Sequence, residues 1–299
     1  MNHNALTETP TATVEITPAV VRSLVDTQFP QWAEFPLTFA SEGWDNVTYR
    51  LGGSLAIRLP RREATLATVA AEHEWLPRIS RTWTFAVPAP VALGAPGGDY
   101  PWPWSVVPWI DGSLAMDAPL SAEGAADLGS ALAQIHTAAH ADSPHNRWRS
   151  LPLSGRAEQF TSRLAVLATS TEHALDDDAV RHIVEAAEPR GGLTWCHLDL
   201  HGRNLVTQDG RLAGILDWGD SAAGDPCTDL GQALYLLGTS NFEQCAAAYA
   251  AAGGAGDPHA KRVRAEALTY AVTMATLDDH VYRASGWRAL VDLGVARAA

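Results

Sequence analysis

The most restrictive feature of this sequence is a short β-hairpin signal in a half of the chain that is otherwise patterned as helix. Residues 205–207 and 211–216 are largely apolar, and Asp209-Gly210 lies between them. Asp-Gly is favoured in tight hairpin turns because both turn positions need a positive φ. The surrounding sequence has apolar residues three or four positions apart, which predicts helices. The second half of the chain is therefore expected to combine an antiparallel strand pair with helices.

Three polar side chains flank this hairpin in an order that suits one kind of chemistry. Asn204 directly precedes the first strand, Asp217 ends the second, and Asp199 lies five residues before Asn204. Antiparallel pairing places Asn204 beside Asp217, and Mg²⁺ prefers such amide and carboxylate oxygens. A further carboxylate can orient a hydroxyl and accept its proton. The spacing predicts a phosphoryl-transfer site with Asp199 as the base, Asn204 and Asp217 as metal ligands, and Gly219 as the turn after Asp217.

Two histidines in the same segment leave an alternative open. His197, Asp199 and His201 alternate along the chain, and imidazole with carboxylate also suits zinc in a metal-dependent hydrolase. No credible further cluster of zinc-binding residues accompanies them. In the phosphoryl-transfer interpretation, His197 orients the loop by hydrogen bonding and His201 lies near the metal or the substrate.

The first hundred residues carry signals of a mixed, sheet-containing region. Capping residues, a change to period-two alternation and paired glycines are the local signals. The expected elements are a helix that begins at Pro18 with Thr17 as N-cap and ends before Pro30, strands at 47–51 and 54–59 around a two-residue turn at Gly52-Gly53, and a helix over 64–75. Between residues 88 and 108, frequent prolines indicate strands and turns.

The remainder of the chain is predicted to be largely helical. Ser121 is a plausible N-cap for a helix with apolar residues at helical spacing up to position 139. Asp229 is expected to cap a helix that contains residues 230–237. Together the two halves predict an α+β fold.

Composition narrows the classes of function. The net charge of −13 argues against a nucleic-acid partner, which requires clustered basic residues. It would draw in a cationic small substrate, although acidic residues also simply keep a protein soluble. Cys196, Cys227 and Cys245 form no Cys-x-x-Cys pair. The first eighteen residues are polar and end in Thr17-Pro18, which indicates a helix start rather than a signal peptide. We expect a cytoplasmic monomer without a membrane segment.

The motifs around the hairpin resemble the aminoglycoside phosphotransferase family, whose fold is protein-kinase-like. Residues 197–199 with Asn204 resemble its catalytic loop, residues 217–220 resemble its metal-binding loop, and residues 224–230 continue the pattern. The resemblance spans about residues 43–237. It implies an N-terminal nucleotide-binding lobe over 1–108 and a helical catalytic and substrate lobe over 109–299.

The resemblance also implies an activity. A small-molecule O-phosphotransferase of this type uses Mg²⁺ and transfers the γ-phosphoryl group of ATP or GTP to a hydroxyl. The expected acceptor is an aminoglycoside or macrolide antibiotic, whose modification gives resistance. A metabolite kinase acting on a choline-like or homoserine-like acceptor, and a pseudokinase that only binds nucleotide, are the alternatives.

The resemblance assigns nucleotide-binding residues in the first half. Arg58 occupies the strand position where the family usually has a phosphate-pairing lysine, and it keeps the charge but not the geometry of that lysine. Ala56 would line the adenine site. Glu72 is the expected partner of Arg58, with Glu74 or a solvated Arg58 as alternatives.

The hinge and the phosphate loop are assigned in the same way. Val107 and Trp109 lie in the segment that resembles the hinge, whose backbone would meet a purine ring, although Trp109 could equally be a packing aromatic. The loop around Gly43 has one glycine and is a poor version of a glycine-rich phosphate loop. This departure, with Arg58, is what makes a pseudokinase conceivable.

Two departures from the family pattern and one acidic pair concern the substrate side, and a second acidic pair concerns the support of the site. Leu198 and Arg203 replace residues that are usually small in the family, and either could alter the approach of the hydroxyl. Asp278 and Asp279 could recruit an amine or could be a solvated helix terminus. Asp220 and Asp225 are expected to support the site or to cap helices.

Overall fold

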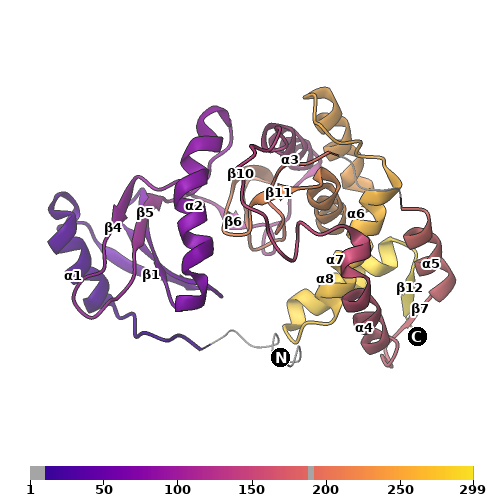
Figure 1. Cartoon of the computed structure of the whole chain (residues 1–299), viewed down its shortest axis with the longest axis horizontal. Coiled ribbons are helices and arrows are strands. Elements are labelled where there is room, and N and C mark those ends of the chain that lie inside the picture. Colours follow the sequence, from indigo (N-terminus) through magenta and orange to yellow (C-terminus); the bar gives the residue numbers. More distant parts are fainter. Residues whose placement is uncertain (1–10, 188–191, 299) are drawn as a thin grey trace.

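The structure is a computed structural model that describes residues 11–187 and 192–298. Figure 1 shows a sheet-containing part built from the first third of the chain beside a helical part built from the rest. This arrangement confirms the predicted α+β fold class. Residues 1–10 belong to the segment that is predicted not to be a signal peptide, and they lie outside the described residues. No helix within the described ranges is long and apolar enough to cross a bilayer.

A five-stranded antiparallel sheet forms the first part. Its strands are β1 Leu37–Glu42, β2 Asn46–Leu51, β3 Leu55–Pro60, β4 Ala92–Gly94 and β5 Trp104–Pro108, in the order β1-β2-β3-β5-β4. Leu51 pairs with Leu55, so three residues connect β2 and β3 instead of the predicted two. Only the first of them, Gly52, has a positive φ (63°), and a two-residue I′ turn would need two such positions.

Two helices accompany this sheet. In α1 Pro18–Gln28, the Thr17 hydroxyl accepts a hydrogen bond from the Val20 N–H, which confirms the predicted cap. Val21, Leu24 and Val25 of α1 pack into the same apolar core as the sheet residues Ile57 and Leu59. The helix α2 Leu66–Ile79 follows a 3₁₀ turn at Glu63–Thr65 and runs one turn past the predicted end. It stands on the side of the sheet that faces the helical part (Figure 1).

The helical part has one large apolar core. Its helices are α3 Ala122–Ile135, α4 Ala157–Leu167, α5 Asp177–Glu185, α6 Pro226–Ala251, α7 Lys261–Ala275 and α8 His280–Asp292. The Ser121 cap of α3 is confirmed, because its hydroxyl accepts from the Gly124 N–H. The predicted cap of α6 is wrong: Asp225 caps this helix and Asp229 lies one turn inside it.

Three small strand groups complete the helical part. They are a sheet of β6 Ser113–Leu114, β9 Leu205–Gln208 and β10 Arg211–Ile215, the pair β8 Thr194–Cys196 with β11 Ala222–Gly224, and the pair β7 His173–Leu175 with β12 Ala296–Ala298. The predicted hairpin is the β9–β10 pair. Asp209 and Gly210 have φ of 52° and 75°, as the Asp-Gly turn requires.

Candidate active site

The candidate base Asp199 lies on the loop between β8 and β9. Its side chain is 17% exposed, and its backbone carbonyl accepts a hydrogen bond from the Asn204 amide at 2.9 Å. Leu198, immediately before it, has a φ of 69°, which is unfavourable for a branched residue. The Leu198 side chain is fully buried against Cys196 and Ala222, so it points away from an acceptor that would approach Asp199.

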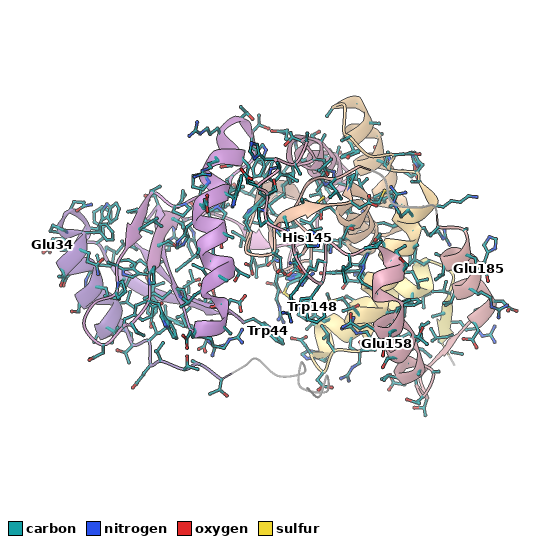
Figure 2. All side chains as sticks on the ribbon, in the orientation of Figure 1. Glu34, Trp44, His145, Trp148, Glu158 and Glu185 are labelled. Atoms are coloured by element: carbon teal, nitrogen blue, oxygen red, sulfur yellow. The ribbon has the colours of Figure 1, made fainter. Side chains whose placement is uncertain are left out.

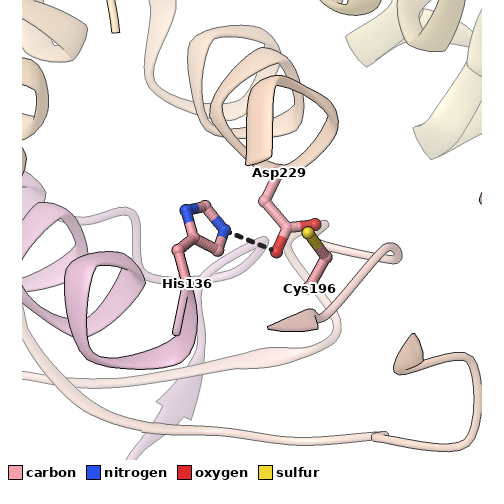
Figure 3. A group of neighbouring side chains, drawn as sticks. All are labelled: His136, Cys196 and Asp229. Carbon is pink, nitrogen blue, oxygen red and sulfur yellow. Dashed lines mark hydrogen bonds and ion pairs between the residues drawn. The ribbon is translucent and has the colours of Figure 1, made fainter. Parts of the chain in front are cut away.

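A buried carboxylate holds this loop in its conformation. The Asp229 side chain accepts hydrogen bonds from the N–H groups of His197 and Leu198, both at 2.7 Å, and lies 3.1 Å from the His136 ring. Figure 3 shows Asp229 between His136 and Cys196. These three could geometrically share a metal ion, but the Asp229 oxygens are already used by the loop. Asp229 is therefore an anchor for the strained backbone before Asp199.

Replacing Asp229 by Ala should lower the free energy of unfolding by about 3 kcal/mol, because two buried N–H groups lose their acceptor. A urea titration followed by tryptophan fluorescence measures this change. Asp178→Ala is a matched control, since the Asp178 side chain is exposed and pairs with Arg181 on the same helix. Equal unfolding free energies for both variants would contradict the anchoring role.

The two candidate metal ligands meet at the open end of the β9–β10 hairpin. Leu205 pairs with Ile215, and the Leu216 N–H donates to the Asn204 carbonyl at 2.7 Å, so the backbone places Asn204 opposite Leu216, the residue directly before Asp217, in agreement with the predicted pairing. Asp217 itself has the positive φ, 57°. Gly219 lies in the turn that follows, which the Ser221 N–H closes by donating to the Trp218 carbonyl at 3.0 Å, so the predicted turn is present although Gly219 does not adopt a positive φ.

The electrostatics of Asp217 suit a cation ligand. Withdrawal from bulk water raises the pKa of Asp217 to about 7; Arg58 opposes the rise, and the nearby carboxylates of Glu72 and Asp199 add to it. Half of the Asp217 side chain is nevertheless exposed. Carboxylates that disfavour each other's charge are relieved by a divalent cation between them. The donor set of carboxylate and amide oxygens therefore fits Mg²⁺.

Arg58 reaches this region from the sheet. It forms an ion pair with the buried Glu72 on α2, and its guanidinium lies 3.7 Å from the Asp217 carboxylate. The contact between Arg58 and Glu72 is as predicted, whereas Glu74 pairs with Arg78 on the surface. Ala56 is buried on the strand face opposite Ile57 and pairs with Val107 on β5.

The remaining nucleotide-site candidates have local partners. The backbone N–H of Trp109 donates to the Ser54 carbonyl at 2.8 Å, and the Trp109 ring lies 4.8 Å from the Arg50 guanidinium. Gly43, in the β1–β2 turn, donates to the Asn46 carbonyl and accepts from Arg61 at 2.9 Å. The structure thus places these residues beside the strands β2 and β3, and their contact with a nucleotide stays a prediction.

The two histidines of the loop are not arranged as zinc ligands. His197 is fully buried; its Nε2 donates to the Leu216 carbonyl at 2.8 Å and its Nδ1 accepts from the Asp199 N–H. Within the described residues, the predicted His197, Asp199, His201 triad does not form a metal-binding group. His201 lies 3.7 Å from Asp199, and burial lowers its pKa to about 4. His197 is the orienting residue that the phosphoryl-transfer interpretation expects.

Two side chains that the sequence did not single out contact Asp199. Arg149, on the loop between α3 and α4, donates from Nη1 to Asp199 Oδ1 at 2.6 Å, and the Tyr270 hydroxyl on α7 donates to the same oxygen at 3.1 Å. Burial is the largest influence and would raise the pKa of Asp199, but Arg149, the two histidines of the loop and the Tyr270 hydrogen bond together outweigh it, and the pKa is lowered. Arg149 follows no local motif, so only the fold could identify it.

The acidic pairs of the substrate side all have partners. Asp279 caps α8 and forms an ion pair with Arg203 at 2.8 Å, and Asp278 pairs with Arg283 on the surface. The helix-terminus alternative for Asp278 and Asp279 therefore describes their position. Asp220 accepts from Asn146 and pairs with Arg149, and Asp225 caps α6.

Comparisons with known proteins concern the family and the fold of this chain. Residues 36–265 match the model of the phosphotransferase enzyme family. The chain is 30% identical over 211 residues to viomycin phosphotransferase of Streptomyces vinaceus, covering 64% of this chain and 69% of that protein. Its fold is similar to that of aminoglycoside 2′-phosphotransferase-IIIa in a GDP complex, with a TM-score of 0.67 and 19% identity over 93% of this chain and 99% of the other. It is also similar to macrolide 2′-phosphotransferase MphH of Brachybacterium faecium, with a TM-score of 0.56 and 23% identity over 89% and 98% of the two chains. The predicted family is confirmed: this chain belongs to the phosphotransferase enzyme family and is a small-molecule O-phosphotransferase.

Proposed function

We propose that this protein transfers the γ-phosphoryl group of ATP or GTP to a hydroxyl of a small molecule in a magnesium-dependent reaction. The observation that carries the proposal is the convergence of Asp199, Asn204 and Asp217 at one hairpin, with Arg58 reaching the same point from the sheet. Carboxylate, amide and guanidinium groups are the parts that phosphoryl transfer needs.

Each residue of the candidate site would have a separate role in the reaction. Asp199 would orient the acceptor hydroxyl and take its proton through Oδ2, because Oδ1 already accepts from Arg149 and Tyr270. Arg58, held by Glu72, would pair with the nucleotide phosphates, while Ala56, Val107, Trp109 and the Gly43 loop would surround the rest of the nucleotide. Asn204 and Asp217 would hold Mg²⁺, which neutralises charge on the phosphates when bound.

The acceptor we propose is an antibiotic, and modification would give resistance by inactivation. Support comes from the sequence match to viomycin phosphotransferase and from the structural neighbours, among them kanamycin, gentamicin and streptomycin complexes. The net charge of −13 favours a basic acceptor at long range. A metabolite of choline-like or homoserine-like chemistry is the second candidate. We also propose a monomer in the cytoplasm, for which the three free, buried cysteines are suitable.

The test is incubation of the purified protein with MgCl₂, ATP or GTP and a panel of aminoglycosides, macrolides, viomycin, choline and homoserine. A mass gain of one phosphoryl group on one compound is the expected result. Nucleotide binding without any modified compound would favour the pseudokinase. Absence of nucleotide binding, with or without Mg²⁺, would refute the proposed function.

A further inference from the structure

The acceptor side of Asp199 is already occupied by a positive charge of the protein itself. Arg149 donates from Nη1 to Asp199 Oδ1 at 2.6 Å and to the Leu198 carbonyl at 2.9 Å, and from Nε to Asp220 Oδ2 at 2.9 Å. Asp199 and Asp220 are the carboxylates that an ammonium group beside the reacting hydroxyl would use. In Figure 2, Trp148 of the same loop lies on the side of the helical part that faces the first lobe.

Two further carboxylates of the helical part are neutralised as well. Asp279 pairs with Arg203 at 2.8 Å, and Glu266 on α7 pairs with Arg156 at 2.5 Å. Asp279 and Glu266, like Asp199 and Asp220, are thus each paired with an arginine. The net charge of the whole chain therefore does not describe the charge that an acceptor meets next to Asp199.

A second arginine adds positive charge without a matching carboxylate. Arg163 on α4 donates to the Thr273 hydroxyl at 2.7 Å, and among residues 11–187 and 192–298 no carboxylate is recorded as its ion-pair partner. Thr273 is one helical turn along α7 from Tyr270, whose hydroxyl contacts Asp199. Burial lowers the pKa of Arg163, and the neighbouring positive charge of Arg149 lowers it further.

We propose that Arg149 selects the acceptor: it reserves Asp199 and Asp220, so the preferred substrate has a neutral or anionic group, and not an ammonium, next to the hydroxyl that is phosphorylated. The inference rests on the proposed function, because it concerns the acceptor of the same site. An ammonium at this position must displace Arg149 from two ion pairs or lie against two guanidinium groups, and both are unfavourable. Positive charges elsewhere on the acceptor remain compatible with it.

A matched pair of acceptors tests this selectivity. One aminoglycoside is supplied with its amino groups free and with them N-acetylated, and kcat/KM is compared for both forms. The wild type should prefer the N-acetylated form, and Arg149→Met should shift the ratio toward the free amine by about tenfold, the effect of ~1.4 kcal/mol. Arg149→Lys, which keeps the charge, should retain the wild-type preference. An unchanged ratio in Arg149→Met would overturn the proposal.

A binding experiment gives an answer even when no acceptor in the panel is turned over. Spermidine serves as a simple ammonium probe and is titrated by calorimetry in the absence of nucleotide. Arg149→Met should bind it about tenfold more tightly than the wild type, and the added substitution Asp220→Asn should remove the gain. Arg163→Met leaves both Arg149 ion pairs in place and should also raise the affinity for spermidine. This second variant tests the effect of the positive charge even if Arg149→Met misfolds.

The two proposals fail in distinguishable ways. If spermidine binds the wild type and all variants equally, Arg149 does not reserve these carboxylates, whatever the enzymatic activity. If the spermidine affinities change as expected but nucleotide does not bind, the proposed phosphoryl transfer fails while the charge arrangement stands.

Discussion

Asp199→Asn should lower kcat by about 10³-fold, within the range for loss of a positioned general base, while the Kd for nucleotide with Mg²⁺ stays nearly unchanged. The amide keeps the size of the side chain and can still accept the hydrogen bond of Tyr270, but it has no negative charge for the hydroxyl proton. Initial rates with the acceptor found by mass spectrometry measure kcat, and calorimetry measures the Kd.

The control for Asp199→Asn is the same change at an exposed aspartate. Asp178→Asn, on α5, removes an exposed carboxylate that pairs with Arg181 on the same helix and should leave both kcat and Kd at wild-type values. A variant at Asp199 that loses nucleotide binding as strongly as it loses turnover would show that this carboxylate belongs to the metal or nucleotide site instead.

Asp217→Asn should raise the Kd for nucleotide by about 10–100-fold when Mg²⁺ is present, the scale on which metal sites weaken when their ligand environment is lost. Without Mg²⁺ the Kd should change little, because half of the Asp217 side chain is exposed and can be lost without breaking the fold. Calorimetric titrations with and without MgCl₂ separate the two cases.

If Asp217 acts by positioning Arg58 and not by binding Mg²⁺, the Asp217→Asn variant should give a different result. Its guanidinium lies 3.7 Å from Asp217, so Asp217 could act by positioning Arg58 for the phosphates. In that case the Kd would rise equally with and without Mg²⁺. Such a result would show that Asp217 positions Arg58 and is not a metal ligand.

Local elements were predictable where short-range chemistry decides the conformation. Thr17 and Ser121 cap their helices because a hydroxyl can satisfy an N–H two or three residues on. Asp209-Gly210 makes the hairpin because both residues accept a positive φ. The cap of α6 was misjudged because Asp229 has capping chemistry, but its carboxylate is used by the buried N–H groups of a loop 31 and 32 positions away.

The core of the candidate site was determined by the sequence alone, because Asp199, Asn204 and Asp217 lie within nineteen positions and a single hairpin joins them. Only the tertiary structure decided what surrounds them. Arg149 and Tyr270 reach Asp199 from 50 and 71 positions away, and no local pattern encodes contacts made when separate helices and loops pack together. The charge of the acceptor side is therefore a property of the fold, although the candidate base can be identified from the sequence.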